Sequence, residues 1–350
     1  MIIKQDIKII AETIKDEARK LERKRLLISG GAGFIGSYIV STIYYLNKRV
    51  FNYPCQVISV DNYITGKERN IFGERSDSNF TFVEHDITKP LNLQEKIDYI
   101  IHAAGLASPV YYRKYPLETI ESAISGVKNL LELAKEKKVK SFLFFSSSEI
   151  YGDPDPNFIP TPETYRGNVS CIGPRACYDE SKRLGETLCM VYYQLYGVPV
   201  KIVRPFNVYG PGMRPDDYRV IPTFLTNALK GKSLPVHGEG NQTRTFCYIS
   251  DAVIGFFKVL LSDKNGEVYN VGNDDNEINM MSLAKMVAEL FDNQIKIKTV
   301  GYPKKYPKGE PKRRCPDLTK IRRQLGYHPT IDLRKGLKRT IRWFRKELSK

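Results

Sequence analysis

The chain has 350 residues and is strongly basic, with 55 lysines and arginines against 39 aspartates and glutamates and a net charge of +16. Hydrophobic residues make up 41% and charged residues 27%, which is ordinary for a soluble globular protein. Apolar runs stay short of the roughly 18 residues that a membrane-spanning helix needs, and the charged N-terminus does not resemble a signal peptide. We therefore expect no membrane partner, and one large or two coupled domains.

The six cysteines and four histidines do not form a recognisable metal or disulfide pattern. No C-x-x-C pair occurs, and no histidines stand at ligand spacing, so we predict no metal site. Scattered single cysteines are typical of a reducing compartment, which favours the cytoplasm.

The basic excess is concentrated at the C-terminal end. Residues 304–350 contain 17 lysines and arginines but only 4 acidic residues. This pattern could indicate a nucleic-acid or anionic-membrane surface. The charges alternate with apolar positions and no nucleic-acid module is recognisable, so we favour a solvated basic helix and expect no nucleic-acid partner.

A glycine-rich turn follows the first predicted strand. Isoleucines spaced at helical intervals predict an amphipathic N-terminal helix within residues 5–24, and 25–29 form a short apolar strand. Gly30, Gly33 and Gly36 then open a second helix-like run. Strand, glycine turn and helix in this order predict a dinucleotide site, because the turn lets a pyrophosphate approach the backbone at a helix N-terminus.

An aspartate ends the second predicted strand, at 56–60. Asp61 can accept hydrogen bonds from the ribose hydroxyls of the adenosine and would repel a 2′-phosphate. The sequence therefore predicts NAD rather than NADP.

Strands and helices alternate through the first 206 residues, which predicts a Rossmann-type, doubly wound parallel sheet of the α/β class. Ligands gather at the carboxyl ends of such strands, where Asp86, Ala103, Ser147 and Glu149 fall. Further strands are predicted at 80–84, 98–102, 141–145 and 200–203, with helices at 116–138 and 176–196.

The alternation breaks after Asn207, where a turn-rich segment follows. We predict a helix at 223–229, a loop at 238–245, a strand at 268–270, a helix at 282–291 and a strand at 295–300. The expected organisation is a helical extension (1–24), an NAD-binding Rossmann domain (25–206, with 242–275 returning to it) and a smaller α/β substrate domain (207–241 and 276–350).

Tyr178 and Lys182 are the predicted catalytic pair. Four residues apart on a helix, they lie on one face, where the ammonium can favour the phenolate and make the tyrosine a usable base. The spacing alone is common, but the glycine turn and the serines at 146–148 precede it in the order of a dehydrogenase site.

The chain resembles the extended short-chain dehydrogenase/reductase family, nucleotide-sugar branch, and within it the UDP-glucuronic acid decarboxylases. The likeness covers nearly all residues after 25. Its specific segments are Ala-Ser-Pro at 107–109 with Tyr112 behind it, Ser-Ser-Ser-Glu-Ile-Tyr-Gly-Asp-Pro at 146–154, and Gly-Pro-Arg-Ala-Cys-Tyr-Asp-Glu at 173–180.

The resemblance implies that a UDP-glucuronate is oxidised at C4, decarboxylated and re-reduced to UDP-xylose, with NAD remaining bound. Tyr178 would be the base, Lys182 would tune it, and Ser147 would share the hydrogen bond to the 4-oxygen. Glu149 would act at C5 and C6, and Arg244 beside the sugar and diphosphate. The implied NAD-binding residues are Gly30, Gly33, Phe34, Ile35, Gly36, Asp61, Asn62, Asp86, Ile87, Ala103, Ala104, Tyr178, Lys182 and Pro205. The implied substrate-binding residues are Ser108, Pro109, Tyr112, Glu149, Asn207, His237, Arg244 and Arg314.

Other outcomes stay open at this stage. A 4,6-dehydratase or 4-epimerase of the same branch would use the same tyrosine and lysine, although Glu149 weighs against an epimerase. A non-catalytic NAD-sensing or nucleic-acid-binding protein would need neither residue.

The sequence also departs from the decarboxylase pattern. Arg214 follows Met213 instead of preceding it, His237 stands where a tyrosine usually stacks on uracil, and Glu121-Ser122-Ala123 replaces a Thr-Asn-Thr run. Family members usually dimerise through a four-helix bundle, so the resemblance implies a homodimer formed by 117–133 and 184–196.

Overall fold

The computed structural model describes residues 2–65, 77–275, 277–302 and 311–349, so part of the basic C-terminal stretch lies outside the described residues. Its centre is a seven-stranded parallel sheet with the order β11-β6-β5-β4-β1-β2-β3. The run β3-β2-β1-β4-β5-β6 is the strand order of a Rossmann fold, which confirms the predicted fold class. The strands are β1 (Arg25–Ser29), β2 (Gln56–Asp61), β3 (Phe80–Glu84), β4 (Tyr99–His102), β5 (Ser141–Phe145), β6 (Val200–Pro205) and β11 (Glu267–Val271).

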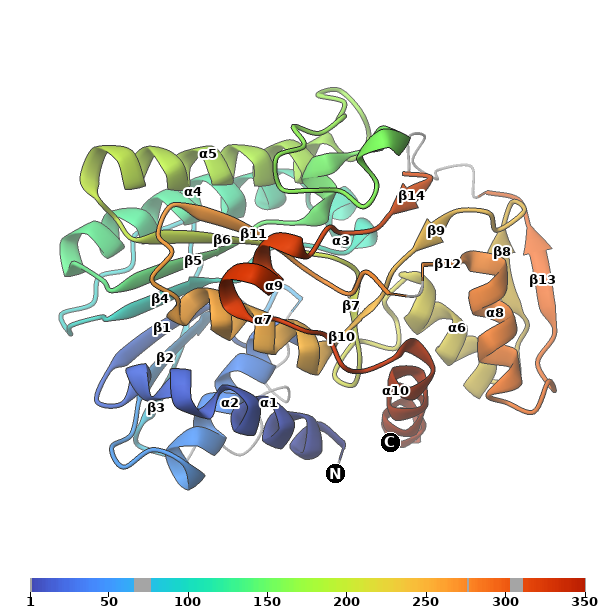
Figure 1. The fold of residues 1–350 in the computed structure, drawn as a ribbon, viewed down its shortest axis with the longest axis horizontal. Helices are drawn as coiled ribbons and strands as arrows, with labels where there is room; N and C mark the ends of the chain where they lie inside the picture. Colours follow the sequence, from blue (N-terminus) through green and yellow to red (C-terminus); the bar gives the residue numbers. More distant parts are fainter. Residues whose placement is uncertain (1, 66–76, 276, 303–310, 350) are drawn as a thin grey trace.

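Helices cover both faces of this sheet (Figure 1). On one face α4 packs against α5, and on the other α1, α2 and α7 contact one another. Their bounds are α1 (Ile2–Ala18), α2 (Phe34–Arg49), α4 (Pro116–Lys137), α5 (Ala176–Tyr196) and α7 (Ile249–Leu261), with the short α3 at Pro109–Lys114 and 3-10 turns at Arg19–Leu21, Ser148–Tyr151 and Pro156–Phe158.

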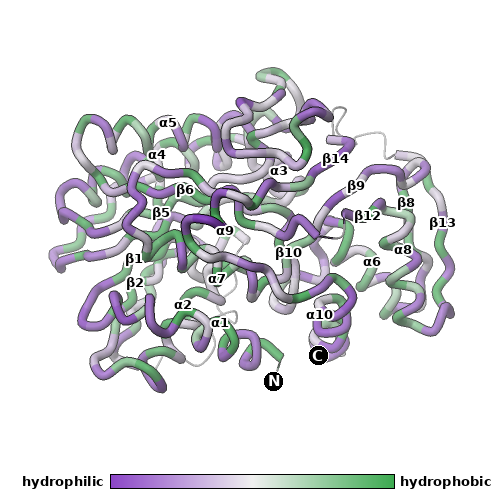
Figure 2. Tube along the Cα trace, in the orientation of Figure 1, coloured by the Kyte–Doolittle hydropathy of each residue, from purple (hydrophilic) through white to green (hydrophobic). Residues whose placement is uncertain are grey.

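The central strands β4 and β5 are buried throughout, because helices cover both faces of the sheet and consecutive residues of a strand point to opposite faces. In β5, Phe142 and Phe144 belong to the core beneath α4 and α5, whereas Leu143 and Phe145 belong to the core that contains α1, α2 and α7. Figure 2 shows the hydrophobic colour along these central strands and mostly hydrophilic colour along α10.

A smaller α/β part lies beside the carboxyl edge of the sheet (Figure 1). In it β8 pairs in parallel with β13, and the two-residue strand β9 lies between β12 and β14. Its elements are α6 (Val220–Leu229), β8 (Leu234–His237), β9 (Thr243–Arg244), β12 (Ile278–Asn279), α8 (Met280–Glu289), β13 (Ile297–Val300) and β14 (Arg313–Arg314). The pair β7 (Val208–Tyr209) and β10 (Cys247–Tyr248), with α9 (Thr319–Leu325) and α10 (Leu333–Leu348), joins this part to the sheet.

Several predicted boundaries were wrong. The predicted loop 238–245 contains β9, which is too short to show strand periodicity, and the helix predicted from Thr223 starts at Val220. The second and sixth strands extend beyond their predicted ends, to Asp61 and Pro205.

The N-terminal helix is held by a carboxylate buried among polar partners. Asp6 is fully buried, and its carboxylate lies 2.5 Å from Arg339 of α10. It also accepts hydrogen bonds from the hydroxyls of Tyr248 (2.9 Å) and Tyr38 (3.3 Å). Burial raises the pKa of Asp6 to about 6, although Arg339 opposes the shift.

We predict that Asp6→Asn removes a pH-dependent contribution to stability. Because the folded pKa lies above the usual value, the wild type loses stability as pH rises from about 4 to 6, by about 3 kcal/mol. The free energy of unfolding, measured against pH, should show this slope in the wild type and in a variant of the exposed Asp16, Asp16→Asn, but not in Asp6→Asn. Parallel curves for all three proteins would contradict the assignment.

Candidate active site

Two adjoining cavities follow the carboxyl edge of the parallel sheet. The first lies over the ends of β1, β2 and β4. The second, of about 450 Å³, extends from the ends of β5 and β6 into the smaller part of the molecule. Ala103 and Gly105, directly after β4, line both. A ligand with two connected halves therefore fits across the end of β4.

The glycine turn lies at the wall of the first cavity. Gly30 has φ +80°, and a Cβ there would lie 2.7 Å from the Ala104 nitrogen. A Cβ on Gly36 would lie 2.1 Å from the Gly30 carbonyl oxygen. Gly33 precedes α2 at its N-terminus and lines the cavity. The backbone and the helix end are thus exposed to a ligand there, as a pyrophosphate requires.

Acidic side chains surround the first cavity although the protein carries a net charge of +16. Asp61, Asp86, Glu118 and Glu121 line it, and no lysine or arginine is among its described lining residues. Asp61 accepts hydrogen bonds from the backbone nitrogens of Ala32 (3.0 Å) and Tyr63 (2.9 Å). Burial raises its pKa, which these backbone donors oppose. Carboxylates accept from ribose hydroxyls and repel a 2′-phosphate, so the residues fit NAD.

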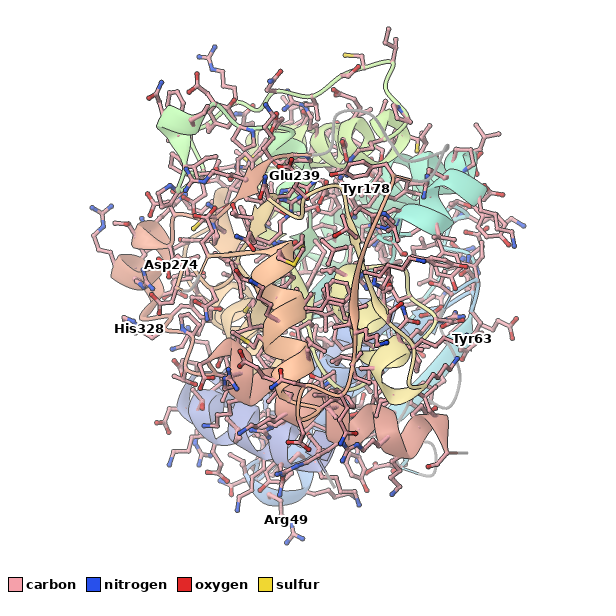
Figure 3. The ribbon with its side chains drawn as sticks, turned by 90° about the vertical axis from the view of Figure 1, so that its right-hand side faces the viewer. Arg49, Tyr63, Tyr178, Glu239, Asp274 and His328 are labelled. Carbon is pink, nitrogen blue, oxygen red and sulfur yellow. The ribbon has the colours of Figure 1, made fainter. Side chains whose placement is uncertain are left out.

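Tyr178, Lys182 and Ser147 converge on the second cavity. Figure 3 labels Tyr178 inside the outline of the molecule, whereas Arg49 projects from its edge. The Tyr178 ring is 4% exposed and stacks on Tyr112, with centroids 5.2 Å apart. Its hydroxyl interacts with the Ser147 side chain. The stacked ring fixes the tyrosine at the cavity wall, with the Ser147 side chain near enough to lower its pKa.

Lys182 is fixed to the end of strand β5. Its ammonium donates to the Phe145 carbonyl (2.8 Å) and lies 6.0 Å from the centroid of the Tyr178 ring. A Cβ on Gly105 would lie 3.3 Å from the same nitrogen, so the glycine leaves room for the lysine. Burial lowers the pKa of Lys182 to about 8.

The pKa of Tyr178 depends on more groups than its spacing from Lys182 suggests. Burial raises it, and the hydrogen bond with Ser147 is the largest opposing influence. The cations that lower it are Arg219 and Arg175, both on the cavity wall. The sequence predicted that Lys182 favours the phenolate, whereas the main cationic influences in the structure come from these two arginines.

Glu149 is paired with two arginines from distant segments. One is Arg314 of β14, and the other is Arg175, directly before α5. The Arg175 Nε also lies 3.5 Å from Asp179 Oδ2. The side chains of Arg314 and Arg175 are 4% and 11% exposed, so both ion pairs are largely shielded from water.

Arg244 and Arg314 occupy neighbouring strands in register, β9 and β14. The Arg244 guanidinium donates to the Thr243 carbonyl (2.8 Å) and lines the second cavity. Asn207 donates to the Thr245 carbonyl (2.8 Å) and has φ +40°. The far wall of the cavity therefore presents cations and an amide, which suit a diphosphate.

His237 lies at the outer end of the second cavity, at the end of β8. Its ring stacks on Tyr302 with centroids 5.8 Å apart, and its Nδ1 lies 3.2 Å from the Gly301 carbonyl oxygen. The imidazole thus belongs to a small aromatic platform, although the tyrosine expected at this position is absent from the sequence.

Most of the predicted site residues line one of the two cavities. The first is lined by Gly30, Gly33, Asp61, Asn62, Asp86, Ile87, Ala103 and Ala104. The second is lined by Ile35, Ala103, Pro109, Tyr112, Ser147, Glu149, Tyr178, Lys182, Pro205, Asn207, His237, Arg244 and Arg314.

Three predicted residues lie outside both linings. Phe34 meets the Tyr38 ring edge-on, with centroids 6.2 Å apart, and Gly36 permits the close helix–strand approach described above. Ser108 is buried directly before α3, where its carbonyl accepts from the nitrogen of Tyr112 (3.1 Å). These three residues therefore contact neighbouring residues and do not line either cavity.

Many other lining residues were not predicted, and five of them bear directly on the charge or geometry of the site. Gly105 could have been found, since it follows the small residues that end β4, and Glu118 and Glu121 share one face at the start of the helix predicted at 116–138. Arg175 lies in a quoted motif without an assigned role. Arg219 carries no local signal, because only the folded loop brings it to Tyr178.

Known proteins resemble this chain in sequence and in fold. A model of the "NAD dependent epimerase/dehydratase family" matches residues 26–272. The chain belongs to this family. It is 42% identical over 313 residues to UDP-glucuronic acid decarboxylase 5 of Arabidopsis thaliana, covering 89% of this chain and 87% of that protein. It is 39% identical to UDP-glucuronic acid decarboxylase 1 of Xenopus tropicalis, covering 93% and 73%.

Solved structures of this epimerase/dehydratase family share the fold. The dTDP-glucose 4,6-dehydratase of Streptomyces venezuelae, solved with NAD bound, has a TM-score of 0.81 at 29% identity, covering 93% of this chain and 98% of that one. The UDP-glucuronic acid 4-epimerase of Bacillus cereus, solved with UDP-glucuronic acid and NAD, has a TM-score of 0.78 at 28% identity, covering 93% and 99%. NAD is the cofactor of this family, and the first cavity fits it.

Within the described part of the chain, no helix combines the length and apolar character needed to cross a bilayer. Nor do three or more potential metal ligands come together within the described ranges.

We predict that Lys182 loses its proton near pH 8, well below an ordinary lysine, because it is buried. An NMR titration of labelled lysine side chains should show two signals that titrate early, because burial also lowers the pKa of Lys201 to about 8. Only the Lys182 signal should vanish in Lys182→Arg. A Lys182 signal that titrates with the bulk of the lysines would contradict the prediction.

Proposed function

We propose that this protein is a UDP-glucuronate decarboxylase that forms UDP-xylose with tightly bound NAD. The observation that carries the proposal is that Tyr178, Ser147 and Lys182 share one cavity with the arginine-bound Glu149, in a chain 42% identical to a UDP-glucuronic acid decarboxylase. Residues 207–241 and 276–350 would bind the nucleotide sugar, and 25–206 with 242–275 the NAD. The six cysteines are free thiols in the structure, which supports a reducing, cytoplasmic setting.

The chemistry begins at the sugar 4-hydroxyl. Tyr178 takes its proton while Ser147 holds the oxygen by a hydrogen bond, and Lys182 keeps a positive charge beside the phenolate. The residues that line the first cavity would hold NAD, which would supply the hydride acceptor for C4 and the hydride donor at the end of the cycle. Tyr178 then gives its proton back to the 4-oxygen, so the residue is unchanged after one turnover.

Decarboxylation follows because the C5 carboxylate is now β to a ketone. The C5–C6 bond breaks, its electron pair passes into the carbonyl, and the negative charge develops on the 4-oxygen. Ser147 and Tyr178 both contact this position and can stabilise the charge by hydrogen bonding. One solvent proton replaces the lost CO₂ at C5.

Anion recognition would come from the far wall of the cavity. Arg244 and Arg314 lie in register on adjacent strands, and Asn207 is held nearby by the Thr245 carbonyl. Guanidinium groups bind phosphate oxygens through paired hydrogen bonds. The pair would therefore hold the diphosphate, while His237 on Tyr302 would offer a ring for the base to stack on.

A 4-epimerase or 4,6-dehydratase is the second candidate. The likeness to a UDP-glucuronic acid 4-epimerase favours it, because that enzyme carries the same sugar nucleotide. Epimerisation retains the carboxylate and decarboxylation loses it, so these two reactions give products of different mass.

We expect the protein, incubated with UDP-glucuronate and NAD, to release CO₂ and give a product lighter by that mass. Tyr178→Phe should lower this rate by at least about 10³-fold because it removes the base, and should leave NAD binding intact. Mass spectrometry of the product and calorimetry with NAD measure the two effects. Unchanged product mass would favour epimerisation, and wild-type rates from Tyr178→Phe would refute its role.

A homodimer is part of the same proposal. Helices α4 and α5 pack side by side on one face of the sheet (Figure 1), and exposed apolar side chains remain on them. Leu117 and Leu195 are 69% and 68% exposed, and Leu184, Val191 and Tyr196 are also exposed. Two such helix pairs can bury these side chains in a four-helix bundle.

We predict that Leu195→Glu with Leu184→Glu converts a dimer to a monomer, because a charge at each position would be buried without a partner. Light scattering after size-exclusion chromatography measures the mass. The matched control is Leu348→Glu, an exposed leucine (38%) on α10, which should remain dimeric. A monomeric wild type would refute the dimer.

A further inference from the structure

Arg175 is fixed to the same helical turn as the catalytic tyrosine. Its carbonyl accepts hydrogen bonds from the backbone nitrogens of Tyr178 (2.9 Å) and Asp179 (3.0 Å), at the start of α5. Its side chain lines the second cavity and is 11% exposed. Any group that the guanidinium holds is therefore placed relative to Tyr178 by one rigid turn.

The guanidinium bridges two carboxylates. It forms an ion pair with Glu149, which follows strand β5, and its Nε lies 3.5 Å from Asp179 Oδ2 on the next turn of α5. Asp179 is itself buried, and among the influences on its pKa Arg175 is the largest that opposes burial. A planar guanidinium with several donors suits such a bridge, whereas a lysine offers one point charge.

The second cation on Glu149 has a different attachment. Arg314 lies on β14, in register with Arg244, on the wall that the proposed function assigns to the diphosphate. A phosphate competes with Glu149 for that guanidinium. Arg175 faces Glu149 from the catalytic helix, so its hold on the carboxylate does not depend on the diphosphate wall.

We propose that Arg175 is the positioning residue for Glu149 in the step that follows C4 oxidation, an inference that rests on the proposed function. Bridged between Glu149 and Asp179, its charge is already balanced, so it does not trap the substrate carboxylate in a stable ion pair. Loss of CO₂ requires that carboxylate to give up its charge, and a free arginine beside it would oppose this. Arg175 thus acts on decarboxylation through Glu149. Its own influence on the pKa of Tyr178 is smaller than those of Ser147 and Arg219, so C4 oxidation proceeds without it.

The test compares Arg175→Gln, Glu149→Gln, the double variant and Arg175→Lys, each with NAD bound. Arg166→Gln, an exposed arginine in the loop before α5, is the matched control. The quantities to be measured are kcat and KM for CO₂ release, and the near-ultraviolet absorbance of reduced nicotinamide after mixing with UDP-glucuronate. Circular dichroism and thermal unfolding verify that each variant folds.

Arg175→Gln should lower kcat by about 10²-fold, since a misplaced group costs about that much, and change KM by less than about threefold. Reduced nicotinamide should accumulate, because oxidation proceeds and the next step is slowed. The double variant should be no slower than Glu149→Gln, as residues that act through one another are non-additive. Arg175→Lys should retain part of the wild-type kcat, and the control Arg166→Gln should retain all of it.

Two results would overturn the inference while the proposed function stands. One is an additive loss of kcat in the double variant, and the other is a loss of the reduced-nicotinamide signal in Arg175→Gln as large as its loss of kcat. A wild type that releases no CO₂ would refute the proposed function itself, and the assignment of Arg175 to decarboxylation with it. If Arg175→Gln fails to fold, Arg175→Lys and Glu149→Gln still decide the question: a lysine variant with unchanged kcat and no accumulation would overturn it.

Discussion

The hydrogen bond from Lys182 to the Phe145 carbonyl joins helix α5 to the end of strand β5, and the catalytic geometry depends on it. Ser147 lies two residues beyond that carbonyl, and Tyr178 lies one helical turn before the lysine. One bond between two regular elements therefore sets the relative positions of three functional side chains. Gly105 contributes by leaving space at the lysine nitrogen, which no side chain with a Cβ would do without a shift.

The two cavities have opposite electrostatic character. Carboxylates surround the first, whereas arginines dominate the far wall of the second, where Arg244 and Arg314 lie in register. An adenosine ribose offers hydroxyl donors to the first cavity, and a diphosphate offers anionic oxygens to the second. The carboxylates of the first cavity thus suit ribose hydroxyls and the arginines of the second suit a diphosphate, whatever the excess of positive charge on the whole chain.

Features encoded by local spacing could be predicted from the sequence. The strand alternation, the glycine turn, and Tyr178 with Lys182 depend on neighbouring residues, and their elements lie close to where they were expected. The partners of Glu149 could not be predicted in this way, because Arg314 is 165 residues away in the chain. The strands β9 and β14 have two residues each, too few for a periodic signal. Burial, which dominates the pKa of Tyr178, is likewise a property of the fold.

Residues 26–272 match the family model. Segments outside this range also bear on the active site. Asp6 of α1 and Arg339 of α10 form a buried pair that accepts a hydrogen bond from Tyr38. The Tyr38 hydroxyl also lies 3.0 Å from the Pro211 carbonyl oxygen, two residues before Met213 on the wall of the second cavity. Both terminal helices therefore brace, through one tyrosine, the loop that borders the proposed sugar site. Because removing one partner of a buried ion pair is costly, the loss of either helix would leave the charge on the other without its partner. Helices α1 and α10 are thus part of the scaffold of the site, although they contribute no side chain to its cavities.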